Sequence, residues 1–209
     1  MKKPLLVLAC LLYPTTVFAE TSEEWDGGFG AVAERRTGFA FGVDAGLGLG
    51  NANGYPNDAV KLNDPRYEAD TGFGAGGLGR AWLGGTIRDW FSFGLGMEML
   101  SLKGNDITAK GYGVILRPEI YPLWSLGRAY RDLGAYANFG LGWLTARRGS
   151  ADVADGGSLG MFGVGLFHET FRGYHLAIGP TAGCSLYFSE TMKATVAQLG
   201  LRVSFTSGP

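Results

Sequence analysis

Apolar and polar residues alternate with a period of two in eight segments of the chain. The last segment shows this most clearly, with Leu199, Leu201 and Val203 on one face and Gln198 and Arg202 on the other. A period of two is typical of a β-strand whose two faces meet different surroundings. The pattern predicts strands at residues 38–50, 73–87, 91–102, 111–121, 133–147, 158–171, 175–188 and 195–205.

Two of these strands do not show which face is apolar. In 73–87, Leu78 and Trp82 have the same parity as Arg80, and in 158–171 Met161 and Phe167 compete with Phe162, Val164 and Leu166 of the opposite parity. The facing of both strands therefore stays open.

The connections between the strands differ in length. Those at 51–72, 103–110 and 148–157 are long and polar, and 189–194 is polar but shorter; 88–90 and 172–174 are tight, and 122–132 is intermediate. An even number of strands near ten residues long, with long loops at one end and short turns at the other, is typical of outer-membrane barrels. Pro118 is expected to mark a bulge.

Charged residues share the face opposite the apolar one. They are Asp44, Arg80, Glu98, Arg117, Glu119, Glu169 and Arg202. The interior of an eight-stranded barrel is just wide enough for side chains to fill it, and an unpaired charge there is costly. These residues are therefore expected to form a salt-bridged interior network, with a role in packing and pairing instead of catalysis. A soluble β-sandwich also alternates, but it gives no reason for such a charged set.

Aromatic residues are expected to form two belts at the membrane surfaces. Trp90, Phe91, Tyr121, Trp124, Phe171, Tyr174 and Phe205 fall at the short-turn end, and Tyr112, Trp143, Tyr187 and Phe188 fall near the long loops.

Residues 1–19 have the features of a secretory signal peptide: Lys2 and Lys3, a short apolar run and a small residue, Ala19, before Glu20. A lipoprotein signal ending at Cys10 is the second interpretation. Cleavage after Ala19 would change the formal net charge from −1 to −3, because the segment carries two lysines and no acid, and this argues against nucleic-acid binding. Cys184 would then be the one cysteine left, so no internal disulfide is expected.

The end of the chain resembles a known signal. Gln198, Gly200, Val203 and Phe205 match the C-terminal β-signal of bacterial outer-membrane proteins, although residues 206–209 follow the aromatic. The chain resembles the small eight-stranded barrels related to the transmembrane domain of outer-membrane protein A. The resemblance implies an all-β, antiparallel, transmembrane up-and-down barrel at 37–205 in the bacterial outer membrane, after a lead-in at 20–36 and before a tail at 206–209. It also implies contact with outer-membrane lipids, and insertion by periplasmic chaperones and the barrel assembly machinery.

The expected role is structural or surface-interacting, through loop 51–72, with the outside partner left open. A narrow channel for small molecules is the first alternative and a lipid-modifying enzyme the second, but His168 and His175 lie near the short-turn end, which disfavours catalysis at the outer leaflet. No cofactor or metal is expected: the glycines at 74–79 match a dinucleotide fingerprint in spacing without a following helix pattern. A soluble lipocalin-like barrel also stays open, and its interior would be apolar.

Overall fold

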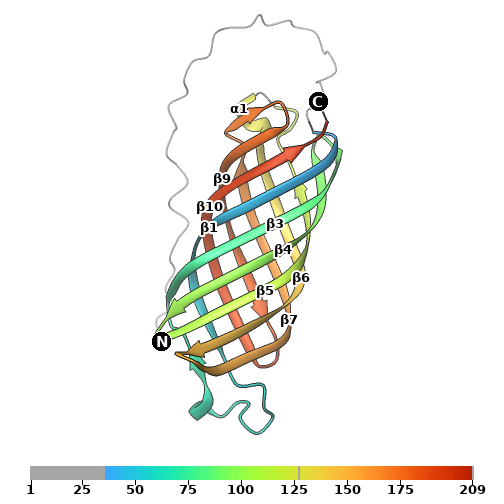
Figure 1. Ribbon diagram of the computed structural model, residues 1–209. Helices are drawn as coiled ribbons and strands as arrows, with labels where there is room; N and C mark the ends of the chain where they lie inside the picture. The colour runs from blue at the N-terminus through green and yellow to red at the C-terminus, as the bar shows by residue number, and fades with distance from the viewer. Residues whose placement is uncertain (1–35, 127, 209) are drawn as a thin grey trace, which may run out of the picture. The chain divides into compact units, whose positions relative to one another are not determined.

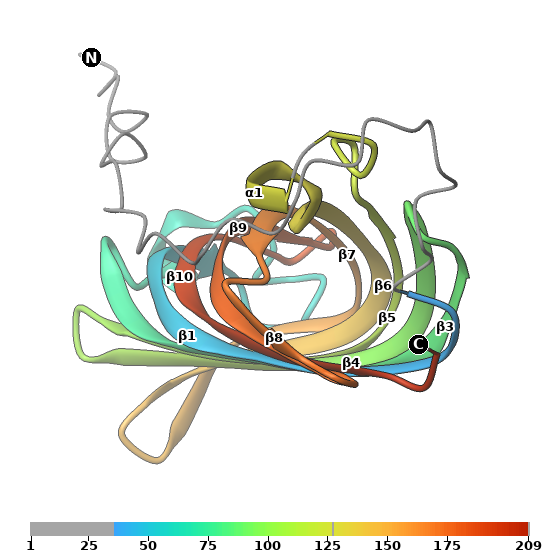
Figure 2. The same cartoon turned by 90° about the horizontal axis from the view of Figure 1, so that it is seen from above.

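Eight long antiparallel strands close into a barrel in the computed structural model, which describes residues 36–126 and 128–208 (Figure 1). The strands are β1 Gly38–Gly54, β3 Gly74–Arg88, β4 Phe91–Gly104, β5 Ile107–Ile120, β6 Leu133–Arg148, β7 Ala151–His168, β9 Leu176–Phe188 and β10 Met192–Thr206. Each pairs with the next, and β10 pairs with β1 along its whole length, which closes the ring seen in Figure 2. The predicted all-β, eight-stranded up-and-down barrel is confirmed.

Four short elements complete the described chain. β2 Ala69–Asp70 pairs with the end of β1, and β8 Phe171–Gly173 pairs with the start of β9. A 3-10 turn, η1 Pro65–Tyr67, lies in the first loop, and helix α1 Arg128–Arg131 follows β5. No helix in the described part of the chain is long and apolar enough to cross a membrane. The predicted signal peptide and all but the last residue of the predicted lead-in lie outside the described residues.

In the two strands whose facing the sequence left open, the bulky residues with the same parity as Arg80 and Glu169 point inward, and those of the other parity point outward. In β3, Leu78 and Trp82 are buried beside Arg80, and in β7 Met161 and Phe167 are buried. Trp82 fits into the narrow interior because glycine lies beside it: a Cβ on Gly42 would come within 2.5 Å of the indole ring. The interior therefore combines one very large side chain with neighbours that have none.

The predicted polar loops at 103–110 and 148–157 are wrong, because both segments are hairpins. β4 and β5 run on to a two-residue turn at Asn105 and Asp106, which both adopt positive φ, and β6 and β7 run on to a turn at Gly149 and Ser150. Positive φ at both central residues suits the twist of a tight hairpin. We call this end of the barrel, together with loop 55–68 and the connection 189–191, the tips.

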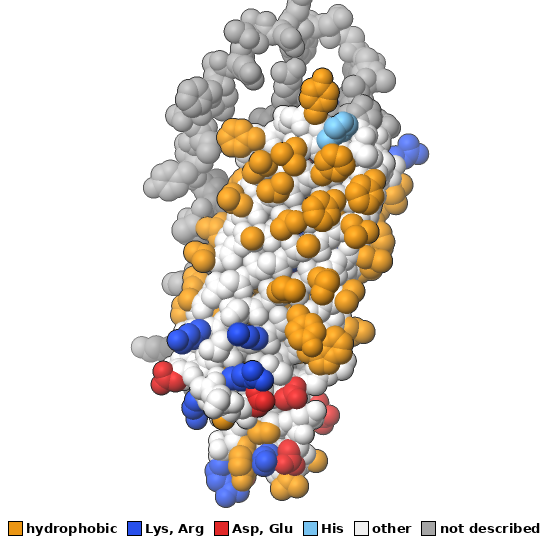
Figure 3. Space-filling view, in the orientation of Figure 1, with side chains coloured by type: hydrophobic (Ala, Val, Ile, Leu, Met, Phe, Trp, Pro, Cys, Tyr) orange, Lys and Arg blue, Asp and Glu red, His pale blue; other side chains and the backbone are white. Residues whose placement is uncertain are grey.

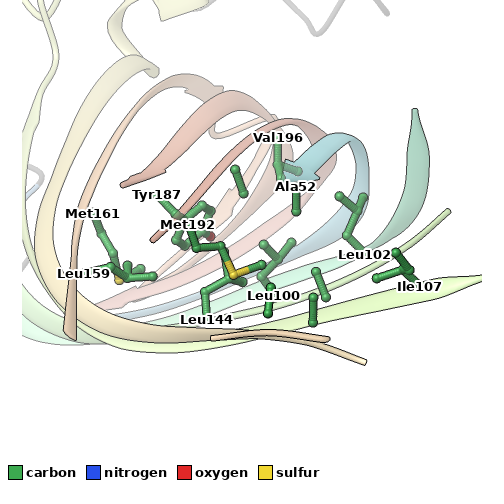
Figure 4. Close-up of a cluster of buried hydrophobic side chains, with 14 of the residues drawn as sticks. Ala52, Leu100, Leu102, Ile107, Leu144, Leu159, Met161, Tyr187, Met192 and Val196 are labelled. Atoms are coloured by element: carbon green, nitrogen blue, oxygen red, sulfur yellow. The ribbon is translucent and has the colours of Figure 1, made fainter. Parts of the chain in front are cut away.

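The hairpins were missed because their pattern is inverted. Beyond the middle of each strand the inward residues become apolar and the outward residues polar, as with buried Leu102 and Ile107 beside exposed Lys103 and Lys110. The inward apolar residues form one cluster, the tip cluster, shown in Figure 4. Its members are Ala52, Ala69, Leu78, Leu100, Leu102, Ile107, Ala109, Ile115, Leu144, Ala146, Ala154, Leu159, Met161, Tyr187, Met192, Ala194 and Val196.

Pro118 causes no bulge, contrary to prediction. Leu116 faces Phe139 and Glu119 faces Tyr136, so the β5–β6 register is the same on both sides of Pro118, and Pro118 itself faces Phe93 of β4. Proline lacks one N–H, and the other backbone groups of the strand keep the register. The register shifts lie elsewhere, for example between Thr86 and Arg88 in the β3–β4 pair.

The aromatic belts are smaller than predicted. Tyr121 and Tyr187 are buried inside the barrel, where they do not meet lipid. Tyr187 lies an even number of positions from the inward residues of β9, and Tyr121 lies an even number from those of β5. Side chains two positions apart in a strand point to the same side, so both rings point inward. Trp124 packs against the buried cluster of Tyr121, Tyr136 and Phe167. The exposed aromatics that remain are Trp90, Phe171, Tyr174 and Phe205 at one end and Tyr112, Trp143 and Phe188 toward the tips.

Candidate functional site

The structure buries all seven charged residues that the sequence pattern placed inside the barrel. Six of them come from β1, β3, β4, β5 and β10, and Glu169 lies between β7 and β8. They form three layers across the interior. The tip-side layer adjoins the tip cluster, the central layer follows it, and the terminus-side layer lies where Arg36 and the end of β10 meet.

The central layer is built around Glu119. Its carboxylate accepts two hydrogen bonds from Arg202, at 2.6 and 2.7 Å, and one from Nε of Arg117 at 2.6 Å. Nη1 of Arg117 also lies 2.7 Å from Oδ2 of Asp44, an ion pair without the alignment of a hydrogen bond. The two guanidinium groups stack on aromatic rings, Arg117 at 4.0 Å from the Tyr136 centroid and Arg202 at 3.9 Å from that of Phe167.

The tip-side layer is built around Arg80. Its Nε donates to Glu98, and its Nη atoms donate to Gln198 at 2.5 Å, Ser185 at 2.9 Å and the Tyr136 hydroxyl at 3.1 Å. The Tyr187 hydroxyl donates to the other oxygen of Glu98. Tyr187 also belongs to the tip cluster, so this residue joins the charged interior to the apolar one.

The terminus-side layer is built around Glu169 and Arg36. Glu169 accepts hydrogen bonds from Arg36 at 2.9 and 3.2 Å, from Arg172 at 2.6 Å and from the Tyr121 hydroxyl at 2.8 Å. Arg36 also donates to Asp132 at 2.5 Å. Its guanidinium lies 3.8 Å from the centroid of the Tyr121 ring. These contacts fix the chain that enters β1 to the mouth of the barrel.

Arg36 was missed because it precedes the first predicted strand. It is fully buried, although the sequence places it in a polar lead-in. The signal was present, since Arg36 has the same parity as the inward residues Ala40 and Asp44. Continuing the alternation of inward and outward residues from β1 back to residue 36 predicts the inward position of Arg36.

Among the described residues, the paired interior charges balance in two groups. Three arginines and three acids form the tip-side and central layers: Arg80, Arg117 and Arg202 with Asp44, Glu98 and Glu119. Three more of each form the terminus-side layer: Arg36, Arg131 and Arg172 with Asp89, Asp132 and Glu169. Glu169 was the surplus acid of the predicted set, and its partners are arginines outside that set.

Electrostatics keep Glu169 ionised. Burial alone would raise the pKa of its carboxyl, but the positive charges of Arg36, Arg202 and Arg172 outweigh this and lower the pKa below its usual value. The group is therefore a carboxylate at neutral pH, in keeping with the three hydrogen bonds that it accepts from Arg36 and Arg172 and the one that it accepts from the Tyr121 hydroxyl.

The four residues that resemble an assembly signal divide between the two faces of β10. Gln198 points inward and accepts from Arg80. Gly200 is also on the inner face, where a Cβ would come within 2.2 Å of the Ala45 carbonyl oxygen. Val203 and Phe205 are exposed on the outer face.

The outer surface of the barrel is apolar over most of its height. Figure 3 shows apolar side chains covering the wall from the terminus end to a boundary short of the tips, where Lys, Arg, Asp and Glu gather. We call this surface the membrane belt; it includes Leu47, Leu83, Leu95, Met97, Met99, Val114, Leu141, Leu166, Leu199 and Leu201.

The membrane belt decides between a soluble and a membrane-spanning barrel. Such a continuous exposed apolar surface does not suit water. The interior at the same height is charged, whereas the lipocalin-like alternative requires an apolar interior. The chain is a membrane-spanning β-barrel of the outer-membrane kind. Barrels of this architecture belong to the bacterial outer membrane.

No family model and no curated protein matches the sequence. The fold is similar to solved outer-membrane barrels. Ail, the attachment invasion locus protein of Yersinia pestis, is 12% identical with a TM-score of 0.47, over 79% of this chain and 98% of that one. Neisserial surface protein A is 15% identical with a TM-score of 0.44, over 78% and 97%. OprG from Pseudomonas aeruginosa is 12% identical with a TM-score of 0.42, over 83% and 99%.

The tips carry a cleft between loop 55–68 and the β6–β7 hairpin. Its volume is about 240 Å³, and Pro56, Arg66, Tyr67, Glu68, Ala69, Arg148, Asp152 and Val153 line it. The Arg66 guanidinium donates a hydrogen bond to the Asp64 carboxylate at 2.6 Å, and this side-chain hydrogen bond, with a second one from the Arg66 backbone N–H, lowers the pKa of Asp64. Among the described residues, no group of His, Cys, Asp and Glu is arranged to hold a metal ion.

Proposed function

We propose that this protein is a non-conducting outer-membrane barrel that presents its tips to a partner outside the cell and carries out no catalysis. The charge-paired interior is the observation that supports this proposal most. All eight long strands contribute to it, because Tyr136 of β6, Phe167 of β7 and Ser185 of β9 contact the arginines supplied by the other strands. Ions would have to break these pairs to pass.

The tips face outward in this proposal. Longer connections of outer-membrane barrels lie outside the cell and short turns lie in the periplasm. Loop 55–68 is at the tips, and the hairpins of β4–β5 and β6–β7 continue there beyond the membrane belt. Arg36 and Gly208, the ends of the described chain, lie at the opposite end, where Gly208 bonds to Thr37.

The cleft at the tips is the surface that we propose for the outside partner. Val60 is 86% exposed and Tyr67 is half-exposed, so the loop offers apolar contact area between its charges. Those charges are held in pairs, Lys61 with Asp58 and Arg66 with Asp64, which gives the loop a defined surface.

Conductance in planar bilayers tests the closed interior. We expect the purified, refolded protein to give no steady single-channel openings, while a porin inserted in the same bilayer conducts. Steady openings would contradict the proposal and favour the narrow channel.

Labelling of intact cells tests the orientation. In a Cys184→Ser background, Ser150→Cys in the β6–β7 turn should react with a membrane-impermeant maleimide. A Tyr174→Cys variant, in the turn at the other end, should react only after the outer membrane is opened. The reverse result would place the tips in the periplasm.

We propose no catalysis because the two histidines are far from the tips and serve local contacts. Nδ1 of His168 lies 3.1 Å from the Thr170 hydroxyl, and Nδ1 of His175 lies 2.9 Å from the Thr206 carbonyl oxygen. Lipid A from cells that overproduce the protein should keep its mass. A new lipid A species that disappears in a His168→Ala or His175→Ala variant would revive the enzyme alternative.

A further inference from the structure

Three cations lie together on the outer wall of β4, β5 and β6. Lys103 faces Thr108, which faces Arg147, and in the neighbouring row Lys110 lies between Ser101 and Thr145. Residues opposite each other in such pairs are about 5 Å apart, and diagonal neighbours about 7–8 Å. Lys103, Lys110 and Arg147, with the hydroxyls of Ser101, Thr108 and Thr145, therefore form one surface, which we call the cationic patch. Figure 3 shows Lys and Arg side chains in this zone, between the membrane belt and the acids of the tips.

The patch is hollowed. A depression of about 270 Å³ is lined by Thr108, Lys110, Thr145, Arg147 and Gly149. Two cationic side chains and two hydroxyls are among these lining residues, and Asp152, which is not one of them, pairs with Arg147. This set of donors matches a phosphate group, which accepts several hydrogen bonds and carries negative charge.

The two lysines of the patch differ from the cations of the first loop. In the described part of the chain no ion pair includes Lys103 or Lys110, whereas Lys61 and Arg66 in the first loop each have a carboxylate partner. Arg147 is held by Asp152 at 2.5 Å, which fixes its position. Like charges on neighbouring strands repel each other. The patch is therefore a local excess of positive charge that an anion would relieve, although the net charge of the whole chain is slightly negative.

The height of the patch identifies the source of the anion. Tyr112 and Trp143 stack on the outer wall with their ring centroids 5.4 Å apart, at the place where the membrane belt ends. Lys110 is two residues beyond Tyr112, which is about 7 Å along a strand and about 5 Å along the membrane normal for a strand tilted by about 35–45°. The polar headgroup region extends about 5–8 Å beyond the hydrocarbon on each side of a bilayer. Lys110 thus lies at the depth of lipid phosphates.

We propose that the cationic patch binds the phosphate-bearing headgroup of a lipid in the outer leaflet. The lysine ammonium groups and Arg147 contact the phosphate, while Tyr112 and Trp143 lie against the region where the headgroup meets its acyl chains. This inference rests on the proposed outward orientation of the tips, which the cysteine-labelling experiment tests separately.

Native mass spectrometry in a neutral maltoside detergent tests the site, with bisphosphorylated lipid A as the probe. We expect the protein to bind lipid A about tenfold more tightly than the same lipid with its phosphates removed. The Lys103→Gln/Lys110→Gln variant should lose this preference. A Lys61→Gln/Lys193→Gln variant, which removes the same charge outside the patch, should keep it. All three proteins should show the same shift between unheated and boiled samples on gels, so that unfolding is not the cause.

Three results would overturn the proposal. They are equal binding of the two lipids, an equal loss in the control variant, and displacement of lipid A by an equal concentration of inorganic phosphate. The last result would make the patch a site for soluble anions. None of these depends on which compartment the tips face, so a failure here is distinct from a failure of the labelling experiment.

Discussion

The membrane belt and the tips are two sections of one barrel with opposite polarity. In the belt section the interior is charged and the outside apolar, and in the tip section the interior is apolar and the outside polar. β5 shows this within one strand: Ile107 and Ala109 point inward at the tips, and Arg117 and Glu119 point inward in the belt, all with the same parity. Strand geometry decides which way a residue points, and the surroundings of the wall decide which chemistry it has.

The two sections are therefore stabilised differently. The tip section meets water and can bury apolar side chains inside, as a soluble protein does. The belt section is surrounded by lipid, so apolar residues on its outside gain little from folding in the membrane, and contacts across the interior must hold the strands together. Substitutions that separate these two mechanisms test the comparison.

Removal of the Glu119 charge should have the largest effect. In a Glu119→Gln variant Arg202 and Arg117 lose their shared carboxylate and stay buried, which costs roughly 3–5 kcal/mol of the free energy of unfolding. Urea unfolding in lipid vesicles measures this cost, and Glu190→Gln, an exposed change of the same kind, is the control. A cost below about 1 kcal/mol would show that the interior ion pairs do not hold the belt section together.

A pair of leucines in β6 compares the sections directly. Leu144 is fully buried in the tip cluster, and Leu141 is 67% exposed on the belt. Leu144→Ala should cost about 2–5 kcal/mol because it leaves a cavity. Leu141→Ala should cost less than about 1 kcal/mol, because its side chain contacts lipid before and after folding. Equal costs in vesicle unfolding would mean that the tips and the belt share one mechanism.

The sequence predicts the belt section better than the tips. In the belt, outward apolar residues alternate with inward glycines and charges, so parity identifies strands and the interior set from Asp44 to Arg202. At the tips, the inward residues are apolar and the outward residues are polar. Outward residues such as Lys103 in the β4–β5 hairpin and Asp152 in the β6–β7 hairpin made both segments resemble polar loops. Arg36 was hidden for a related reason, because its inward position is recognisable only once β1 is extended backwards. Which carboxylate each arginine contacts depends on the closure of the barrel, which no local pattern contains.

The terminus-side layer should make stability depend on acid. The folded-state pKa of Glu169 is lowered, so its contribution is complete above its unfolded value of about 4.3 and is lost as pH falls through the lower folded-state pKa. Unfolding measured from neutral pH down to acid should show this loss. In an Arg36→Gln variant, which lacks one of the charges that lower the pKa, the folded-state pKa should lie closer to the unfolded value. The stability at neutral pH should then be smaller, and the acid-dependent loss should be smaller and complete at a higher pH. An unchanged pH profile would mean that Arg36 does not act on Glu169.

Phe205 should have the smallest effect on stability and a separate effect on assembly. Its ring lies on the outer face of β10 next to His175, with centroids 5.6 Å apart, and makes no contact with the interior charge layers. Phe205→Ala should lower the free energy of unfolding by about 1 kcal/mol or less, as for an aromatic that stays in lipid. We propose that the Phe205→Ala substitution lowers the amount of barrel inserted in cells several-fold. The reason is that the assembly machinery would bind the β10 segment through Phe205 before the barrel closes. Leu201→Ala, on the same face of the same strand, is the matched control, and heat-modifiable protein in the outer-membrane fraction is the measurement. Equal insertion of the two variants would leave Phe205 as an ordinary belt residue.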